Sequence, residues 1–202
     1  MNAFVNDSLA SSKMSTSKIE FLEKFNMLPP EVRAGLDAGT LKLVDHVLYS
    51  TKLLGGSTSK ELMEASDDKK EGITNVNGRK MEALQYFCVK GIRLSGAVVS
   101  GSDAITEATI ANQKFGKLSD GVMNGELEIL VSGKTAFPRN SCGAFSADEN
   151  GYNGLSSYYE LDCPFMIAPQ SEIVPTLRVN SNVVTTREVV RIELIGTKII
   201  PA

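Results

Sequence analysis

The sequence predicts a mainly β protein, in which a short α-helical segment over residues 1–83 precedes an antiparallel β-sandwich over residues 84–202. The spacing of the apolar residues changes near residue 83, from the three-to-four spacing of helices to the alternation of strands. After that point, turn dipeptides such as Asn124-Gly125 and Asn150-Gly151 separate the apolar runs. Several medium-length strands joined by such turns predict a sandwich or a barrel.

The first predicted helix covers residues 18–27. Ser17 and Glu20 have the spacing of a capping box, in which each side chain satisfies a free backbone amide at the helix start. Pro29 and Pro30 end the helix. An apolar stripe at three-residue spacing lies between these signals: Ile19, Leu22 and Phe25.

A second helix is predicted over residues 41–54, because Leu41, Val44 and Leu48 form an apolar stripe and Gly55-Gly56 provides a C-terminal stop. The charged, turn-rich residues 61–80 are expected to be a connector. The apolar faces of both helices are too small to form a core of their own. We therefore expect them to pack on the sandwich or on another chain.

The strands are predicted from alternation, as where Leu127 and Ile129 alternate with Glu126 and Glu128. The predicted strands are residues 86–99, 126–131, 158–167, 172–179 and 189–199. Gly91 and Gly196 lie where the alternation shifts, which predicts a β-bulge.

Residues 105–118 are compatible with a helix or a strand. Ser102 or Asp103 could cap a helix, but Thr106, Thr109 and Ile110 favour extended chain. The balance favours a strand with a loop.

Composition excludes several classes of protein. The net charge is -3 and is evenly spread, with 11 basic and 12 acidic residues before residue 84 and 10 and 12 after it. No basic arm for direct nucleic-acid binding is expected. The apolar runs are far shorter than the roughly 18 residues of a membrane-spanning helix, and residues 1–18 lack the apolar core of a secretion signal. The odd number of cysteines, three, predicts buried thiols in a reducing cytoplasm.

The residues predict neither an enzyme nor a metal or cofactor site. His46 is the only histidine, and it falls on the second predicted helix, so we interpret it as a helix-surface or interface residue. The three cysteines and His46 are too scattered for zinc. Residues 148–153 lack the alternating acidic ligands of a calcium loop, and Gly55-Gly56-Ser57-Thr58 lacks the lysine of a phosphate-binding loop.

Two predicted strands contain an internal proline, Pro164 and Pro175, and each must lie at a sheet edge or interrupt its ladder. Together with residues 124–134 and 190–198, these segments resemble the jelly-roll coat proteins of tailless icosahedral bacteriophages. The resemblance covers residues 84–202. It implies a single jelly roll of eight strands, of which the sequence identifies five or six. The others would come from residues 61–78 or 105–118.

The resemblance also implies a function and partners. The chain would be a capsid subunit, made in the host cytoplasm and located in the virion. It would self-assemble into an icosahedral shell with copies of itself and other virion proteins. The N-terminal arm would then reach neighbouring subunits through its apolar side chains: Ile19, Leu22, Phe25 and Leu28.

Two other classes of protein remain. A carbohydrate- or receptor-binding β-sandwich module of a phage particle would use Tyr152, Tyr158 and Tyr159 near the Asn-Gly loops to stack on sugar rings. The absence of tryptophan disfavours it. An enzyme on a jelly-roll scaffold would need a cluster of histidine and carboxylate ligands, and the chain has one histidine.

Overall fold

The protein is seen here in a computed structural model that describes residues 28–101, 104–145, 158–180 and 186–202. These described residues form eight strands and four short helices. The strands are β1 (Leu41–Leu53), β2 (Ser59–Glu61), β3 (Tyr86–Val98), β4 (Glu126–Val131), β5 (Lys134–Ser141), β6 (Tyr158–Ile167), β7 (Ile173–Arg178) and β8 (Glu188–Pro201). The helices are α3 (Pro30–Asp37), α4 (Glu107–Ala111), α5 (Asp120–Met123) and the 3-10 turn η2 (Cys142–Phe145). The first predicted helix, residues 18–27, lies outside the described residues.

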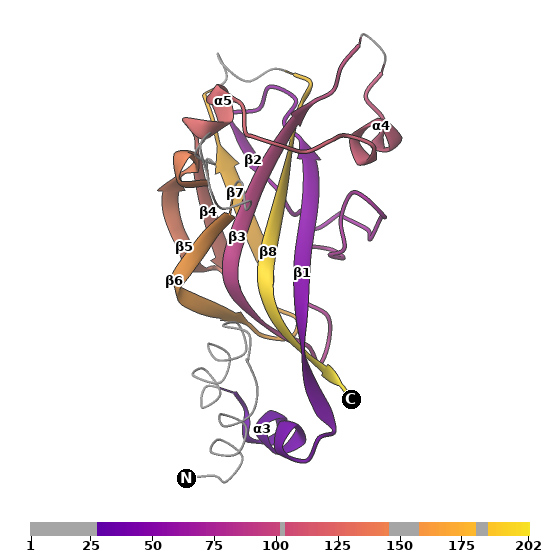
Figure 1. Ribbon diagram of the computed structural model, residues 1–202, viewed down its shortest axis with the longest axis vertical. Helices are drawn as coiled ribbons and strands as arrows, with labels where there is room; N and C mark the ends of the chain where they lie inside the picture. The colour runs from indigo at the N-terminus through magenta and orange to yellow at the C-terminus, as the bar shows by residue number, and fades with distance from the viewer. Residues whose placement is uncertain (1–27, 102–103, 146–157, 181–185) are drawn as a thin grey trace.

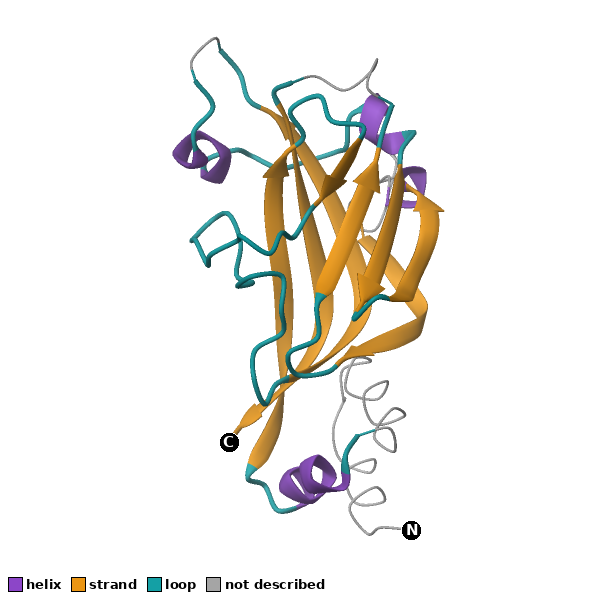
Figure 2. Ribbon diagram, turned by 180° about the vertical axis from the view of Figure 1, so that it is seen from behind, coloured by secondary structure: helices purple, strands orange, loops and turns teal. Residues whose placement is uncertain are grey.

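The strands form two antiparallel sheets that pack face to face (Figures 1 and 2). Sheet A has the order β1-β8-β3-β6, and sheet B has the order β2-β7-β4-β5. Both sheets take strands from either side of residue 83, because β1 and β2 precede it. The predicted antiparallel β-sandwich is confirmed.

The strand pairs are nested. β1 pairs with β8, β2 with β7, β3 with β6 and β4 with β5, all antiparallel. Within the sheets, β8 also pairs with β3, and β7 with β4. The first four strands therefore pair with the last four in reverse order.

The predicted helix over residues 41–54 is wrong, because these residues form strand β1. Every residue of β1 is paired with β8, from Leu41 opposite Pro201 to Leu53 opposite Val189. Buried and half-buried residues occur on both faces of the strand, so apolar residues occur on both and no simple alternation appears in the sequence. The long-range pairing overrides the apparent helical stripe.

The expectation that residues 105–118 would supply a missing strand was wrong. Residues 105–118 contain α4 and no strand, although Gly116 forms an isolated bridge with Gly96. Besides β1, the strands that were missed are β2, which ends at Glu61, and β5, which follows β4 through a two-residue turn at Ser132 and Gly133. Both turn residues have positive φ, 50° and 75°, as in the tight turns that match the twist of antiparallel strands.

The predicted bulge is confirmed in β3. Val89 pairs with Gly196 and Gly91 with Ile195, so Lys90 is the extra residue. A Cβ on Gly196 would lie 1.8 Å from the carbonyl oxygen of Cys88, and one on Gly91 would lie 2.3 Å from the ring of Tyr158. Glycine is needed at position 196 because the neighbouring atoms are backbone, whereas a side chain at position 91 would require the Tyr158 side chain to move.

Pro164 lies where a ladder is interrupted, as predicted, whereas Pro175 pairs with Ile129 in the continuous β4–β7 ladder. Residues 161–164 of β6, which include Pro164, lie between the paired residues Glu160 and Phe165 and have no partner on β3. Pro175 lies in β7 just past the residue that pairs with Glu61, where β2 ends. Its missing amide therefore costs no hydrogen bond of that ladder.

The main core lies between the sheets and is closed by connecting loops. Its largest fully buried side chains include Phe87 from sheet A, Ile129 from sheet B, Phe145 from η2 and Leu62 and Met63 from the chain after β2. The segment between β2 and β3, residues 62–85, is called the β2–β3 connector below. It both fills the core and positions the candidate site.

Candidate functional site

A second, smaller apolar core joins α3 to the end of sheet A. Leu28 and Val32 are buried against Cys88 of β3 and Ile199 of β8. Pro30 begins α3 at a position where its missing amide costs nothing, and Glu31 lies in the first turn, where its charge is favourable. In Figure 1, α3 lies beyond the sheets, at the end where β8 finishes.

Of the four residues predicted to contact a neighbouring subunit, the structure describes one, Leu28. Leu28 is 3% exposed and contacts its own chain in the small core. Ile19, Leu22 and Phe25 lie outside the described residues. Their contact with a neighbouring subunit stays a prediction.

The β2–β3 connector covers part of the free edge of β1. The Thr51 amide donates to the Ile73 carbonyl at 2.9 Å, and the Asn75 amide donates to the Tyr49 carbonyl at 3.2 Å. The Asn75 side chain accepts from the Tyr49 amide at 2.8 Å and donates to the Val47 carbonyl at 2.7 Å. An uncovered strand edge can pair with another chain, and this stretch of β1 is protected.

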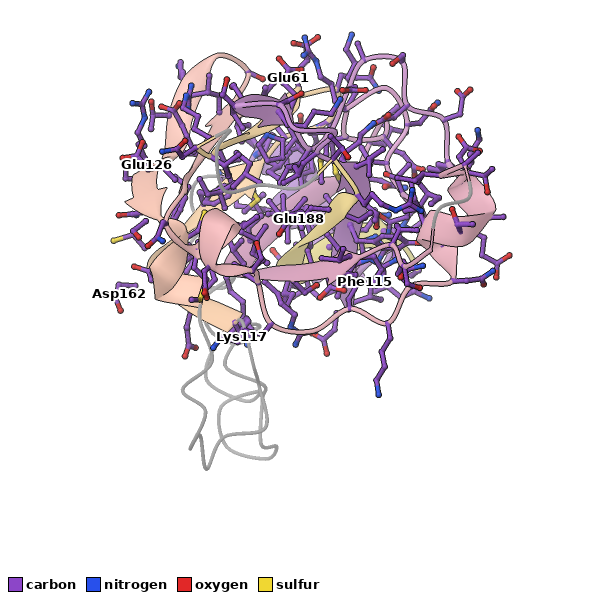
Figure 3. The ribbon with its side chains drawn as sticks, turned by 90° about the horizontal axis from the view of Figure 1, so that it is seen from above. Glu61, Phe115, Lys117, Glu126, Asp162 and Glu188 are labelled. Atoms are coloured by element: carbon purple, nitrogen blue, oxygen red, sulfur yellow. The ribbon has the colours of Figure 1, made fainter. Side chains whose placement is uncertain are left out.

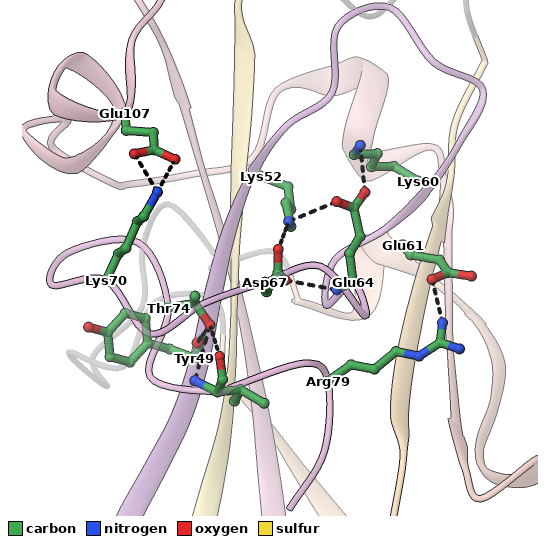
Figure 4. Close-up of polar contacts among 11 residues, drawn as sticks. Tyr49, Lys52, Lys60, Glu61, Glu64, Asp67, Lys70, Thr74, Arg79 and Glu107 are labelled. Atoms are coloured by element: carbon green, nitrogen blue, oxygen red, sulfur yellow. Dashed lines mark hydrogen bonds and ion pairs between the residues drawn. The ribbon is translucent and has the colours of Figure 1, made fainter.

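Ion pairs attach the connector to its surroundings (Figure 4). Lys52 of β1 contacts Asp67 and, at 3.1 Å, Glu64. The ammonium groups of Lys60 and Lys52 lower the pKa of Glu64, with Lys60 the larger cause, against an opposing effect of burial. Lys70 binds both carboxylate oxygens of Glu107, at 2.8 and 2.9 Å, and so joins the connector to α4.

Arg191 of β8 holds a second loop on the outer face of sheet A. Its guanidinium lies 4.2 Å from the ring centre of Phe115 and 5.3 Å from that of Tyr49. It also donates to Thr51 Oγ1 at 2.9 Å and to the Gly72 carbonyl at 2.6 Å. One side chain thus joins β8, β1, the connector and the loop after α4.

The end of the sandwich opposite α3 contains a buried carboxylate. Glu188 is 2% exposed and accepts a hydrogen bond from the Ser119 hydroxyl. Ser119 is also the N-cap of α5, where its oxygen accepts from the Val122 amide at 3.3 Å. Figure 3 looks onto this end, with Glu188 near the middle and Glu126 and Asp162 at the rim.

His46 lies on strand β1, which corrects its predicted place on a helix. Its ring meets Phe87 edge to face, with ring centres 6.0 Å apart. The side chain lines a cavity of about 160 Å³ with the connector residues Lys69, Lys80 and Glu82 and with Lys198 of β8. Burial lowers the pKa of His46, and the charges of Lys198 and Lys69 lower it further, against Glu82.

No sequence spacing predicted this cavity, because its residues come from three distant parts of the chain: residues 46–48, residues 69–85 and residue 198. The concentration of lysine and glutamate in residues 60–82 was visible in the sequence, but it indicated only a solvated connector. The pairing of β1 with β8 brings His46 close to Lys198. This pairing could not be predicted while residues 41–54 were assigned to a helix.

The cysteines differ in exposure. Cys88 and Cys142 are buried as predicted, whereas Cys163 is exposed in the unpaired part of β6, which corrects the expectation for that residue. Burial raises the pKa of the Cys142 thiol to about 12, with a smaller effect of Glu126, so it is protonated at neutral pH. In the part of the chain that the structure describes, no group of three or more His, Cys, Asp or Glu side chains could hold a metal ion.

Two of the tyrosines that a sugar-binding module would use have other surroundings. Tyr159 points into the core, with its ring centre 5.7 Å from that of Phe137 and 5.6 Å from that of Phe145. Tyr158 lies over Gly91. Tyr152 is outside the described residues.

No protein-family model matches the chain, and a search of curated proteins found no match. Among the described residues, none of the helices has the length and apolar character to span a membrane.

Proposed function

We propose that the chain is a capsid subunit with a single jelly-roll fold, which self-assembles into an icosahedral shell. In this proposal, its partners are copies of itself and other virion proteins. It is made in the host cytoplasm and located in the virion.

The observation that carries this proposal is the nested strand pairing. A jelly roll is an eight-stranded, two-sheet sandwich of two Greek keys, and capsid domains are among the proteins that use it. The pairs β1–β8, β2–β7, β3–β6 and β4–β5, divided alternately between the sheets, agree with such a chain. Because a fold does not fix a function, the proposal needs a test of assembly.

The position of α3 also supports a role in assembly. It extends the chain beyond the sheets and is held there by only a small apolar core. Residues 18–27, with the apolar stripe, immediately precede this anchor. An arm fixed at one end of the sandwich is well placed to reach a neighbouring subunit.

The alternative is a carbohydrate- or receptor-binding module, because lectins also use the jelly roll. The core position of Tyr159 counts against it, since a ring that packs on Phe137 and Phe145 is not free to stack on a sugar.

The proposal is tested by the mass and shape of the purified protein, measured by light scattering and negative-stain imaging. Closed shells or regular oligomers are expected. A monomer at every concentration would contradict the capsid proposal and would favour a binding module.

The role of the arm is tested by replacing Leu22 and Phe25 with serine. We expect this variant to lose assembly while its circular dichroism spectrum keeps the β signal. Lys134→Ser, at the exposed β4–β5 turn, is the control and should assemble normally. Unchanged particle size in the arm variant would contradict the proposed contact.

A further inference from the structure

Leu84 is the most exposed large apolar side chain in the described part of the protein, at 83%. It lies in the turn that leads from the connector into β3, where the Gln85 amide donates to the Glu82 carbonyl at 3.4 Å. Its φ is 61°, in the left-handed region that glycine and asparagine adopt more readily than leucine does. The position therefore combines an unfavourable contact with water and an unfavourable backbone conformation.

Two other residues with positive φ lie beside this turn, and contacts within the chain hold both of them. Arg79 has a φ of 50°, and its guanidinium pairs with Glu61 at 2.8 Å. Gln170 has a φ of 60°, and its amide donates to the Met81 carbonyl at 3.1 Å. The Leu84 side chain buries too little surface to offset the same cost. A strained and exposed apolar residue indicates a contact made outside its own chain.

An open groove of about 500 Å³ begins at Ala83, the residue before Leu84. The small side chains of Ala65 and Ala83 leave the groove wide, and the buried side chain of Met81 also lines it. Lys80 and Glu172 lie 3.8 Å apart in its lining, so the groove carries both signs of charge. It is suited to an apolar side chain from a partner that is neither strongly acidic nor strongly basic.

We propose that two copies of the chain pair at this surface, with Leu84 of each copy in the groove of the other. The projecting side chain and the groove lie next to each other, as a two-fold interface requires, because such an interface uses the same patch on both subunits. Burial of the two leucine side chains would stabilise the pair. The choice of a second copy as the partner rests on the proposed function, in which copies of the chain associate. The contact is separate from the N-terminal arm.

Leu84→Asn is the main test, because asparagine removes the apolar side chain and tolerates a positive φ. Sedimentation velocity of the intact protein over a range of concentrations measures the association. We expect the dissociation constant of the pair to rise at least about tenfold. The urea midpoint of the dilute monomer should stay the same or rise. A lower midpoint would mean that Leu84 stabilises its own chain, and it would overturn the proposal.

Three further variants test the groove and supply the controls. Ala65→Arg narrows the groove from the side away from Ala83 in the sequence, and it should weaken association as Leu84→Asn does. Val98→Thr changes an apolar side chain that is 54% exposed and outside the groove, and Ser132→Gly changes another exposed residue with positive φ. Both controls should associate as the wild type does. Normal association of Leu84→Asn or of Ala65→Arg would overturn the proposal.

The outcomes separate this inference from the capsid proposal, when sedimentation is combined with negative-stain imaging. Shells that form equally well with Leu84→Asn would overturn the inference alone. A pair that depends on Leu84 but builds no shell would support the inference and contradict the capsid proposal. A wild-type protein that is a monomer at every concentration would contradict both.

Discussion

Replacing Gly196 with alanine would test the most demanding contact in sheet A. Gly196 pairs with His46 on one side and Val89 on the other, at the bulge of β3. The added Cβ would lie 1.8 Å from the carbonyl oxygen of Cys88, 2.8 Å from its carbonyl carbon and 3.1 Å from the Cα of Val89. All three atoms belong to the backbone, so no rotamer change can relieve the clash.

The expected cost follows from this geometry. An ordinary contact requires at least 3.4 Å, so β3 and β8 must move apart by more than 1 Å at this point. Overpacking of a core costs about 1–3 kcal/mol, and each ladder hydrogen bond lost by the separation costs about 1 kcal/mol. We expect Gly196→Ala to lower the free energy of unfolding by about 3–5 kcal/mol, a large effect for one methyl group.

The assay is urea unfolding followed by circular dichroism. With a denaturant slope of about 2 kcal/mol per molar urea, the midpoint should fall by about 2 M. Gly116→Ala is the matched control, because a Cβ there meets nothing within 4 Å, and its midpoint should stay within about 0.3 M of the wild type. If Gly196→Ala unfolds at the same urea concentration as the control, the reasoning about the bulge is refuted.

Three other substitutions test separate contacts. Ser119→Ala removes the N-cap of α5 and the hydrogen-bond donor to buried Glu188. We expect the free energy of unfolding, measured in urea, to fall by about 1–3 kcal/mol. A fall of less than about 0.5 kcal/mol would contradict the role of that pair. Arg191→Lys keeps the positive charge but removes the planar guanidinium that contacts Phe115 and Tyr49. Residues 104–118 should then be cleaved faster in limited proteolysis. Unchanged cleavage would contradict the role of Arg191 in holding this loop. The folded pKa of His46 is lowered, so the unfolded chain binds the proton more readily and stability should fall as the pH drops below about 6.5. His46→Gln should remove the slope that begins below about pH 6.5, and a slope that persists in the variant would assign it to another group. The fall below about pH 4.5 linked to Glu64 and Glu82 should remain, because their folded pKa values are also lowered.

The sequence predicted the strands that combine alternation with clear turn signals. Residues 158–167 coincide with β6, and the predicted bulge appears where Gly91 and Gly196 break the alternation. β1 was mistaken for a helix because apolar residues occur on both of its faces, so the alternation typical of a strand is missing. β2 is only three residues long, and β5 is an exposed edge strand interrupted by Pro138, so neither has a recognisable pattern.

Less of the candidate site than of the fold could be predicted from the sequence. The sequence marked His46 as unique, but it gave no indication that Lys198 lies nearby. Similarly, Ser119 and Glu188 are 69 residues apart, and only the folded chain shows that the carboxylate is buried. Local spacing carries information about elements, whereas these contacts depend on how distant elements pack.

The nested pairing has a consequence for the order of events during synthesis. The inner hairpin of β4 and β5 can form as soon as residues 126–141 have left the ribosome, because its contacts are local. β8 lies between β1 and β3, so sheet A cannot close until residues 188–201 have been made. Until then, β1 and β3 have no common partner, and α3 cannot complete its contact with Ile199. The small core that holds α3 is therefore complete only after residues 188–201 have been made.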